Sequence, residues 1–203
     1  MAGNQGNGRT RAKAGADRKA EIIEAAANIF MEKGYEAASI QDVADAVNIL
    51  KGSLYYYIKS KDDLLYEVIQ EVHLRGLENL DSQRDSDDPA DVRLHTFVYR
   101  HLTFNAQHLA KMTVFFHDFR SLSPERRALI VEERDQYDKF IRKIIDDGIA
   151  AGVFRADVDS RLAAFSILGS MNWIYQWYRP DGPRAIEEIA DRMATYAVNS
   201  IKA

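Results

Sequence analysis

The chain has 203 residues, a formal net charge of −4 and no cysteine. This length is enough for one well-buried core and a small appended domain, and the lack of cysteine excludes disulfides, thiolate catalysis and cysteine-ligated zinc. The start of the chain is polar, and no later stretch has the uninterrupted apolar length of a membrane span. We therefore expect a cytoplasmic protein with no membrane partner.

The charge is distributed unevenly along the chain. Residues 1–61 contain nine Lys or Arg and seven Asp or Glu, so this part carries +2 and residues 62–203 carry −6. A basic head on an acidic body fits one end docking on DNA. Because the first residues are also rich in glycine and asparagine, we predict a basic flexible arm over residues 1–17. The alternative is a solvated tail that only aids solubility.

A compact series of helix signals follows the arm. Residues 18–33 carry an apolar stripe at helical spacing. Ser39 and Asp42 form a capping-box pattern at the start of a second helix, and Asn48 tolerates the left-handed conformation that a tight turn needs. A short third helix must fit before the next capping signal. This order predicts a three-helix helix-turn-helix unit over residues 18–60.

The short third helix has the composition of a segment that enters the DNA major groove. Glycine and serine allow close approach, and lysines and tyrosine hydroxyls can donate to phosphates. Leu54 and Ile58 would anchor the helix inward. Three consecutive tyrosines cannot all face one core, because each helical residue turns the direction by about 100°, so at least one should be exposed to a DNA phosphate. The alternative is that the tyrosines mainly stiffen the core of the three-helix unit. The predicted DNA contacts are Ser39, Gln41, Lys51, Gly52, Ser53, Tyr55, Tyr56, Tyr57 and Lys61.

The order of residues in this part resembles the DNA-binding signature of TetR-type regulators. Asn48 stands where that family usually has a glycine, and Ile58 stands where it usually has a phenylalanine. The resemblance implies an all-α fold, with an N-terminal three-helix helix-turn-helix domain and a C-terminal helical ligand-binding and dimerisation domain over residues 61–203. It also implies a homodimer and repression. The residues that carry the resemblance are Phe30, Gly34-Tyr35, Ser39 to Ala44, Gly52 to Tyr55, Tyr57 and Ser60 to Leu65.

The C-terminal part begins with a predicted connector helix over residues 61–80. A polar stretch over residues 81–88 predicts a loop, and further helices are predicted over residues 89–108, 111–119 and 123–152. Their aromatic side chains would line a ligand cavity, or else form an ordinary aromatic core, because binding pockets are themselves mostly apolar. The predicted ligand contacts are Phe97, Phe104, Phe115, Phe119, Tyr137, Trp173 and Trp177.

The aromatic set favours a largely apolar effector. Residues 173–183 resemble the corresponding segment of TetR-type regulators of lipid or steroid degradation, which implies an acyl-CoA thioester. A sensor of hydrophobic cations would instead need carboxylates such as Asp118 or Glu133 in the cavity. Four arginines would reach a phosphate-bearing ligand, and the alternative is that they form a solvated helix face. They are Arg120, Arg126, Arg127 and Arg134.

Two C-terminal helices are predicted to hold the dimer together. Residues 159–178 are apolar around almost the whole helix, so this helix must be covered on several sides, and residues 186–201 add a second apolar face. Packed against a second copy, the two helices would form a four-helix interface. The alternative is a larger private core in a monomer. The predicted interface residues are Leu168, Met171, Ile189, Met193 and Tyr196.

Catalysis finds little support in the sequence. The five histidines lack a zinc-binding HExxH pattern, and no nucleophile elbow or phosphate loop is present. We therefore expect no enzyme activity, no metal site and no cofactor. The sequence favours a ligand-responsive repressor that leaves a palindromic operator when it binds a largely apolar small molecule. The alternatives are an effector-independent DNA-binding regulator and a helical enzyme.

Overall fold

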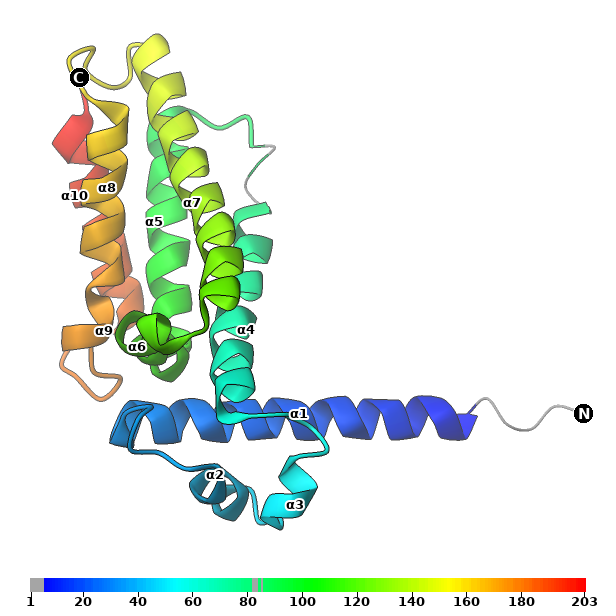
Figure 1. Ribbon diagram of the computed structural model, residues 1–203. Helices are drawn as coiled ribbons and strands as arrows, with labels where there is room; N and C mark the ends of the chain where they lie inside the picture. The colour runs from blue at the N-terminus through cyan, green and yellow to red at the C-terminus, as the bar shows by residue number, and fades with distance from the viewer. Residues whose placement is uncertain (1–5, 82–83, 85) are drawn as a thin grey trace, which may run out of the picture.

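The described part of the protein is built from helices. The computed structural model describes residues 6–81, 84 and 86–203, and these residues contain no strand, which confirms the all-α prediction. In chain order (Figure 1) the elements are α1 (Gly6–Lys33), α2 (Ile40–Ala46), α3 (Lys51–Leu54), α4 (Lys61–Asp81), α5 (Ala90–Gln107), α6 (Leu109–Asp118), the 3₁₀ helix η1 (Phe119–Ser121), α7 (Pro124–Ala150), α8 (Ser160–Asn172), α9 (Ile174–Trp177) and α10 (Ile186–Ile201).

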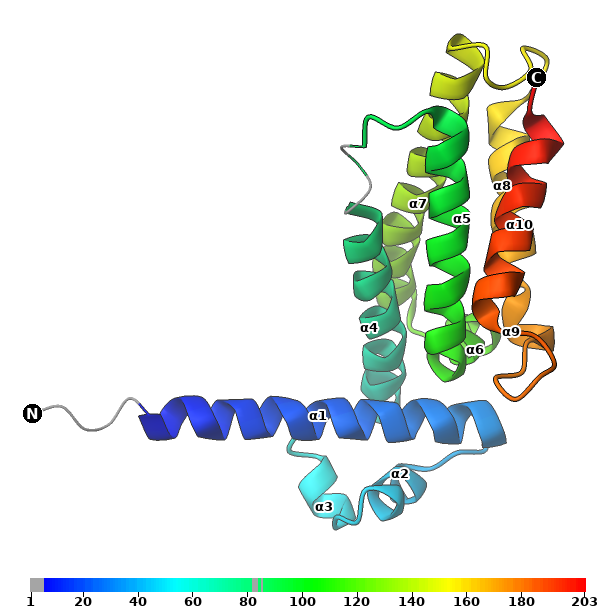
Figure 2. The ribbon, with the colours of Figure 1, turned by 180° about the vertical axis from the view of Figure 1, so that it is seen from behind.

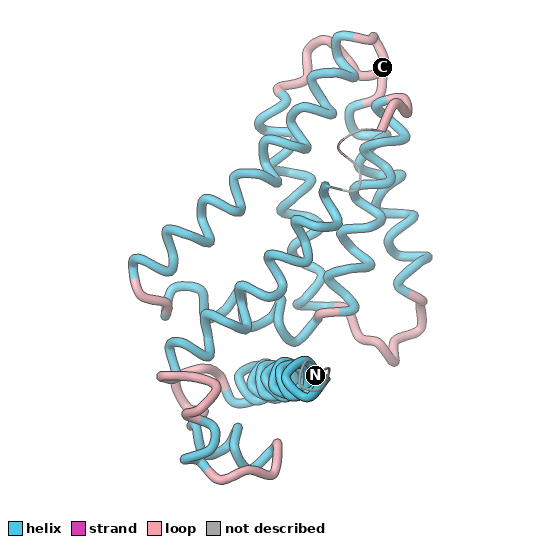
Figure 3. The backbone as a smooth tube through the Cα atoms, turned by 90° about the vertical axis from the view of Figure 1, so that its right-hand side faces the viewer, coloured by secondary structure: helices cyan, strands magenta, loops and turns pink. Residues whose placement is uncertain are grey.

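The helix-turn-helix unit lies at one end of a long helical body. α1 lies across the lower end of the body, with α2 and α3 beneath it, while α4 rises from this unit alongside α7 (Figures 1 and 2). Figure 3 looks along α1 and shows α2 and α3 on one side of it and the body on the other. In the described residues α1 packs against the body mainly through α4 and α6. These two helices therefore connect the parts.

The first helix is longer than predicted. α1 begins at Gly6 instead of residue 18, so residues 6–17, which we predicted to be a flexible arm, are helical, and residues 1–5 lie outside the described part of the chain. Alanine, arginine and lysine are frequent in this segment and have high helix propensities. The prediction gave too much weight to the glycines, which weaken a helix but do not prevent one that is already nucleated by packed residues further along.

Local capping in the helix-turn-helix unit agrees with the prediction. The Ser39 backbone N–H donates to Asp42 Oδ2 at 2.7 Å, and the Asp42 backbone N–H donates to Ser39 Oγ at 3.1 Å, which completes the capping box. The hydrogen bond from Lys33 Nζ at 2.6 Å, together with those from Ser39, holds the pKa of the Asp42 carboxyl well below its usual range. Asn48 has a φ of 53°, the left-handed conformation expected at this turn.

The helix predicted over residues 159–178 is divided in two. The Asp159 carboxylate accepts from the backbone N–H groups of Arg161 and Leu162 at 3.0 Å each and caps α8, which ends at Asn172 before the single turn of α9. In its last turns the Ser170 hydroxyl donates to the Ser166 carbonyl oxygen at 2.9 Å, a bond that bends helices. The other body helices begin and end close to their predicted bounds.

Buried apolar side chains form two cores. The first joins α1, α2 and α3 to α4 and α6, and the second lies among α5, α7, α8 and α10. The first core crosses the boundary predicted at residue 60, because the apolar face of α4 packs on α1. A movement of α4 or α6 therefore acts directly on the helix-turn-helix unit. Representative members of the first core are Phe30, Leu54, Leu65, Val68 and Phe115.

Replacing Gly148 by alanine should destabilise the protein. An added Cβ at this position in α7 would lie 2.2 Å from a ring carbon of Phe154 and 2.9 Å from the Ala90 Cβ, so a buried ring must move. We expect urea denaturation to show a loss of about 1–3 kcal/mol in the free energy of unfolding. The matched control is Gly15→Ala in α1, where nothing lies within 4 Å and alanine should add about 0.5–1 kcal/mol. A Gly148→Ala variant as stable as the wild type would contradict this packing.

Candidate DNA-binding face and effector cavity

The three consecutive tyrosines point in different directions. Tyr56 is 86% exposed and Tyr55 is 47% exposed, whereas Tyr57 is half-buried against the first core. The rings of Tyr56 and Tyr57 meet edge-on with centroids 5.1 Å apart. Leu54 and Ile58 are buried, as their spacing predicted. The segment is therefore divided between residues that anchor it and residues that face solvent.

The other predicted DNA contacts fall into two groups. Ser39 is exposed, but its hydroxyl already takes part in the cap and donates to Asp42 Oδ2 at 2.6 Å. Lys61 Nζ donates to the Glu36 carbonyl oxygen at 3.1 Å and lies 4.4 Å from the Tyr35 ring centroid, so it fixes the start of α4. The sequence did not indicate this structural role. The predicted contacts that are exposed on α2 and α3 are Gln41, Lys51, Gly52 and Ser53, and the Gln41 amide donates to Asp45 Oδ1 at 2.7 Å.

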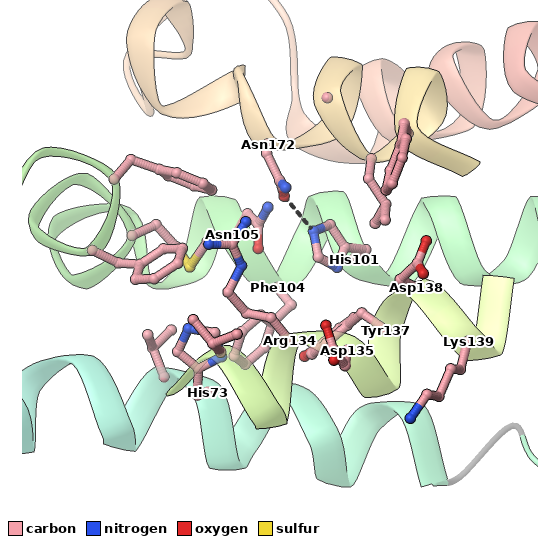
Figure 4. Close-up of a pocket in the computed structure, with 18 of the residues that line it drawn as sticks. His73, His101, Phe104, Asn105, Arg134, Asp135, Tyr137, Asp138, Lys139 and Asn172 are labelled. Carbon is pink, nitrogen blue, oxygen red and sulfur yellow. Dashed lines mark hydrogen bonds between the residues drawn. The ribbon is translucent and has the colours of Figure 1, made fainter. Parts of the chain in front are cut away.

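A cavity of about 690 Å³ lies inside the body (Figure 4). Residues from α4, α5, α6, α7 and α8 form its wall. Of the predicted ligand contacts, Phe104, Phe115 and Tyr137 lie in this wall. Met112 and Phe116, both on α6, lie beside Phe115 in the wall, so α6 supplies much of its apolar surface.

The remaining predicted ligand contacts lie elsewhere. Phe97 is 2% exposed and packs in the second core, with its ring centroid 5.6 Å from that of Phe140. Phe119 packs against the Phe115 ring at 5.6 Å but does not line the cavity. Trp173 and Trp177 are 59% and 45% exposed and do not line the cavity. The prediction was wrong for these four positions, since aromatic content alone does not distinguish a core, a cavity and a surface.

Sequence reasoning missed the polar part of the cavity wall. His101 and Asn105 lie one turn apart on α5 and both face the cavity. His101 Nε2 lies 3.0 Å from Asn172 Oδ1, a hydrogen bond between α5 and α8 that Figure 4 shows as a dashed line. A signal was present, because both residues continue the buried face of Phe97, where an ordinary core helix carries apolar side chains.

α7 supplies most of the charge in the wall. Arg142 forms an ion pair with Asp138. The Arg134 guanidinium lies 5.7 Å from the Phe115 ring centroid, and the Arg161 guanidinium of α8 lies 5.6 Å from the Phe165 ring centroid. Neither Arg134 nor Arg161 has a carboxylate partner among the described side chains. Both are exposed, so the cavity is bordered by two guanidinium groups that can take an anion.

The histidines of the cavity are held neutral. Burial, with the positive charge of Arg134 as a smaller contribution, lowers the pKa of His73 from 6.5 to about 4. Burial also lowers the pKa of His101, although its hydrogen bond to Asn172 opposes this shift. At neutral pH both rings are therefore uncharged and serve as hydrogen-bonding groups.

The predicted dimer residues occupy different environments. Met171 is 1% exposed and belongs to the second core, so its assignment to an interface was wrong, because an all-round apolar helix uses its inner side for the private core. Leu168 lines the cavity. Ile189 and Met193 are partly buried against the second core, and Tyr196 is 66% exposed. Exposed apolar side chains on α8 that the prediction omitted are Leu162 (62%) and Phe165 (50%).

The histidines outside the cavity have surface partners. His95 Nε2 lies 3.3 Å from Asp191 Oδ1, and His117 Nε2 lies 3.1 Å from Gln176 Nε2. Among the described residues, no group of histidine and acidic side chains is arranged to hold a metal ion. None of the described helices combines the length and the apolar content that crossing a membrane requires.

Two family models match the chain. The model described as "Bacterial regulatory proteins, tetR family" matches residues 22–68, and the model described as "Tetracyclin repressor-like, C-terminal domain" matches residues 87–201. Among curated proteins, the chain is similar to the HTH-type transcriptional repressor KstR2 of Mycobacterium tuberculosis. The two are 27% identical over 190 residues, which cover 91% of this chain and 92% of KstR2.

Solved structures of related proteins have the same architecture. The TetR family transcriptional regulator PfmR from Thermus thermophilus superposes with a TM-score of 0.82 at 34% identity, covering 88% of this chain and 97% of PfmR. AibR, solved in complex with isovaleryl coenzyme A and operator DNA, superposes with a TM-score of 0.80 at 29% identity, again covering 88% of this chain and 97% of AibR.

The stability of the protein should fall between pH 6.5 and about pH 4 because of His73. The imidazole ordinarily binds a proton near pH 6.5, but the buried ring binds one only near pH 4, so unfolding takes up a proton in this window and is favoured by acid. The contribution of the neutral His73 ring to the free energy of unfolding is fully present above pH 6.5 and amounts to about 3 kcal/mol at most. We expect His73→Leu to reduce the loss of unfolding free energy between about pH 7 and about pH 4.5 in urea denaturation. An equal loss in variant and wild type would contradict a buried neutral His73.

Proposed function

Because the chain belongs to the TetR family of bacterial transcriptional regulators, we propose that it is a homodimeric repressor that leaves a palindromic operator when an acyl-coenzyme A thioester occupies its cavity. As a member of this family it is a DNA-binding transcriptional regulator. The observation that supports release by an effector is the position of α6, which lines the cavity and also packs against α1.

α3 is the element that reads DNA. The exposed lysine and serine of α3 and the exposed tyrosines of the turn after it enter the major groove and donate to bases and phosphates, while the buried Leu54 and Ile58 hold this segment in place. α3 has only 4 residues, so one copy contacts few base pairs. A two-fold symmetric dimer doubles the readout over half-sites about 34 Å apart. The protein acts in the cytoplasm, where its operator lies.

Exposed apolar residues on α8 and α10 support the dimer. Leu162, Phe165 and Trp173 follow one face of α8 at helical spacing and are each at least half exposed. Tyr196 is 66% exposed on α10, which lies beside α8 (Figure 2). A second copy packed on these two helices would remove this apolar surface from water, which is the main driving force of association.

The cavity suits an effector with an apolar body and an anionic group. Its volume of about 690 Å³ falls within the range of small-molecule sites. The acyl chain lies among the phenylalanine rings of α5 and α6, and the phosphates lie near the exposed Arg161 of α8, since arginine binds phosphate oxygens through two parallel hydrogen bonds. The structure of the related AibR with isovaleryl coenzyme A supports this effector class.

α6 couples the cavity to the DNA-binding unit. Lys111 of α6 is 5% exposed, and its Nζ lies 2.7 Å from Glu24 Oε2 of α1 and 3.0 Å from Glu71 Oε2 of α4. Met112 and Phe115 on the same helix line the cavity. An effector that displaces α6 therefore moves α1 and α4 through the two ion pairs of the buried Lys111.

A second contact ties the connector helix to α7. The Arg126 guanidinium donates to Asp62 Oδ2 at 2.8 Å and to Asp63 Oδ1 at 2.6 Å, and it lies 4.9 Å from the Tyr66 ring centroid. The first turn of α4 therefore follows any shift of α7. A small tilt of α4 changes the separation of the two α3 helices in a dimer, so effector and operator oppose each other's binding by the same factor.

The alternatives receive less support. A hydrophobic cation would need a free carboxylate, but Asp118 does not line the cavity, and Asp138, which does, is paired with Arg142. Asp135 is the second carboxylate in the described wall, where four arginine and lysine side chains outnumber the two acids and disfavour a cation. A regulator without an effector would leave a cavity of about 690 Å³ unexplained. A helical enzyme would have to turn over its ligand, and the described residues of the cavity wall include no serine, threonine or cysteine that a histidine could activate as a nucleophile.

The DNA assignment is tested by selecting DNA fragments that the purified protein binds. Wild type should enrich one palindromic sequence. Tyr56→Ala should lower affinity for that sequence roughly tenfold without lowering Tm, because the side chain is 86% exposed, and Lys51→Ala should also reduce the salt dependence of binding. Arg84→Ala, which removes an exposed cation at the far end of α4, is the matched control and should bind as wild type. Lack of any enriched sequence would refute the assignment.

The effector class is tested on the operator recovered in that selection. An acyl-CoA, its free acid and a lipophilic cation of similar length are compared for release of the labelled operator. We expect release by the acyl-CoA at a concentration at least roughly tenfold below that of the free acid, because only the thioester carries phosphates for Arg161. Arg161→Met should remove this advantage. Release by the cation alone would overturn the acyl-CoA proposal.

A further inference from the structure

Asn105 is buried in the cavity wall with neither of its polar atoms satisfied by the protein. The side chain is 1% exposed, and its Nδ2 and Oδ1 have no hydrogen-bond partner within the described part of the chain. One turn earlier on α5, His101 Nε2 forms a hydrogen bond with Asn172 Oδ1 at 3.0 Å. Another polar side chain of this wall therefore has a partner within the protein. A buried amide without partners destabilises the folded state, and its position in a cavity indicates a ligand that supplies them.

Two further groups lie at the same end of the cavity. Figure 4 shows Asn105, His73 and Arg134 together, well away from Lys139. His73 Nε2 is also buried without a partner in the described residues, and the His73 ring packs edge-on against Phe115 with centroids 4.7 Å apart. Since the Arg134 guanidinium lies over the same Phe115 ring at 5.7 Å, α4, α5, α6 and α7 each supply one side chain to this end.

We propose that this end of the cavity is a subsite for an oxygenated acyl group, whose hydroxyl and carbonyl bind the Asn105 amide. The hydroxyl donates to Oδ1, and the carbonyl oxygen accepts from Nδ2. In a 3-hydroxyacyl group the two oxygens are two carbons apart, so one group satisfies both amide atoms. This inference rests on the proposed function and deepens it, because it names the kind of acyl group that the cavity selects.

Other ligands fit this end less well. A plain acyl chain would leave both atoms of the buried amide unpaired. A carboxylate would pair with Arg134 but would face the lone pairs of Asn105 Oδ1, and a cation would be repelled by Arg134. A site built to bind a hydroxyl discriminates strongly against the analogue that lacks it.

The test is calorimetric titration of the full-length chain with two matched pairs of ligands. One pair is decanoyl-CoA and 3-hydroxydecanoyl-CoA, and the other is the methyl esters of the same two acids, which lack the nucleotide. Wild type should bind the hydroxylated member of each pair at least roughly tenfold more tightly. Asn105→Leu, similar in size but without polar atoms, should reverse this preference, and its Tm should equal or exceed that of wild type.

Asn172→Leu is the matched control, because it makes the same change in the same cavity at an amide that already has a partner. Its Tm should fall while its preference for the hydroxyl remains. If both CoA esters bind equally well to wild type, the subsite is refuted and the acyl-CoA function stands. If only the methyl esters bind, with the hydroxyl preference, the subsite stands and the CoA effector is refuted. If none of the four binds, both are refuted.

Discussion

Lys111 of α6 is almost completely buried between Glu24 of α1 and Glu71 of α4, so three helices share one ion-pair network. A buried ammonium group that lost either carboxylate would keep its desolvation cost without the compensating attraction. The ion pairs therefore oppose a separation of the three helices. Because α1 and α4 orient the helix-turn-helix unit and α6 forms part of the cavity wall, the proposed coupling between the cavity and α3 depends on this network. Arg126 extends the same constraint to the start of α7.

The cavity departs from an ordinary core in a way that lowers stability. His73 and Asn105 bury polar atoms that the described residues leave unpaired, at positions where apolar side chains would pack without penalty. The second core, a few residues away on the same helix at Phe97 and Leu102, shows the ordinary arrangement. We propose that an occupant of the cavity pairs with these polar atoms. The exposed Arg134 and Arg161 in the same wall are positively charged.

Whereas the cavity buries polar atoms, the outer surface of α8 exposes apolar side chains to water. Leu162 and Phe165 of α8 and Trp173 directly after it are each at least half exposed, and Phe165 also borders the cavity. Met171, on the inner side of α8, is used by the private core. The same helix therefore serves three environments: a core, a cavity wall through Leu168, and an apolar outer face. Its all-round apolar sequence reflects these separate demands rather than one interface.

The sequence by itself determined the features that depend on residues within about one helical turn of each other. These are the Ser39–Asp42 capping box, the left-handed turn at Asn48 and the inward anchors Leu54 and Ile58, and with them the helical class and the DNA-binding unit. Only the tertiary structure decided where α1 begins and which aromatic residues line the cavity, because both depend on packing between distant segments. It also decided the polar end of the cavity: His73, Asn105 and Arg134 lie on three helices far apart in the chain. No local pattern records that such side chains meet, since their proximity arises only when the helices pack.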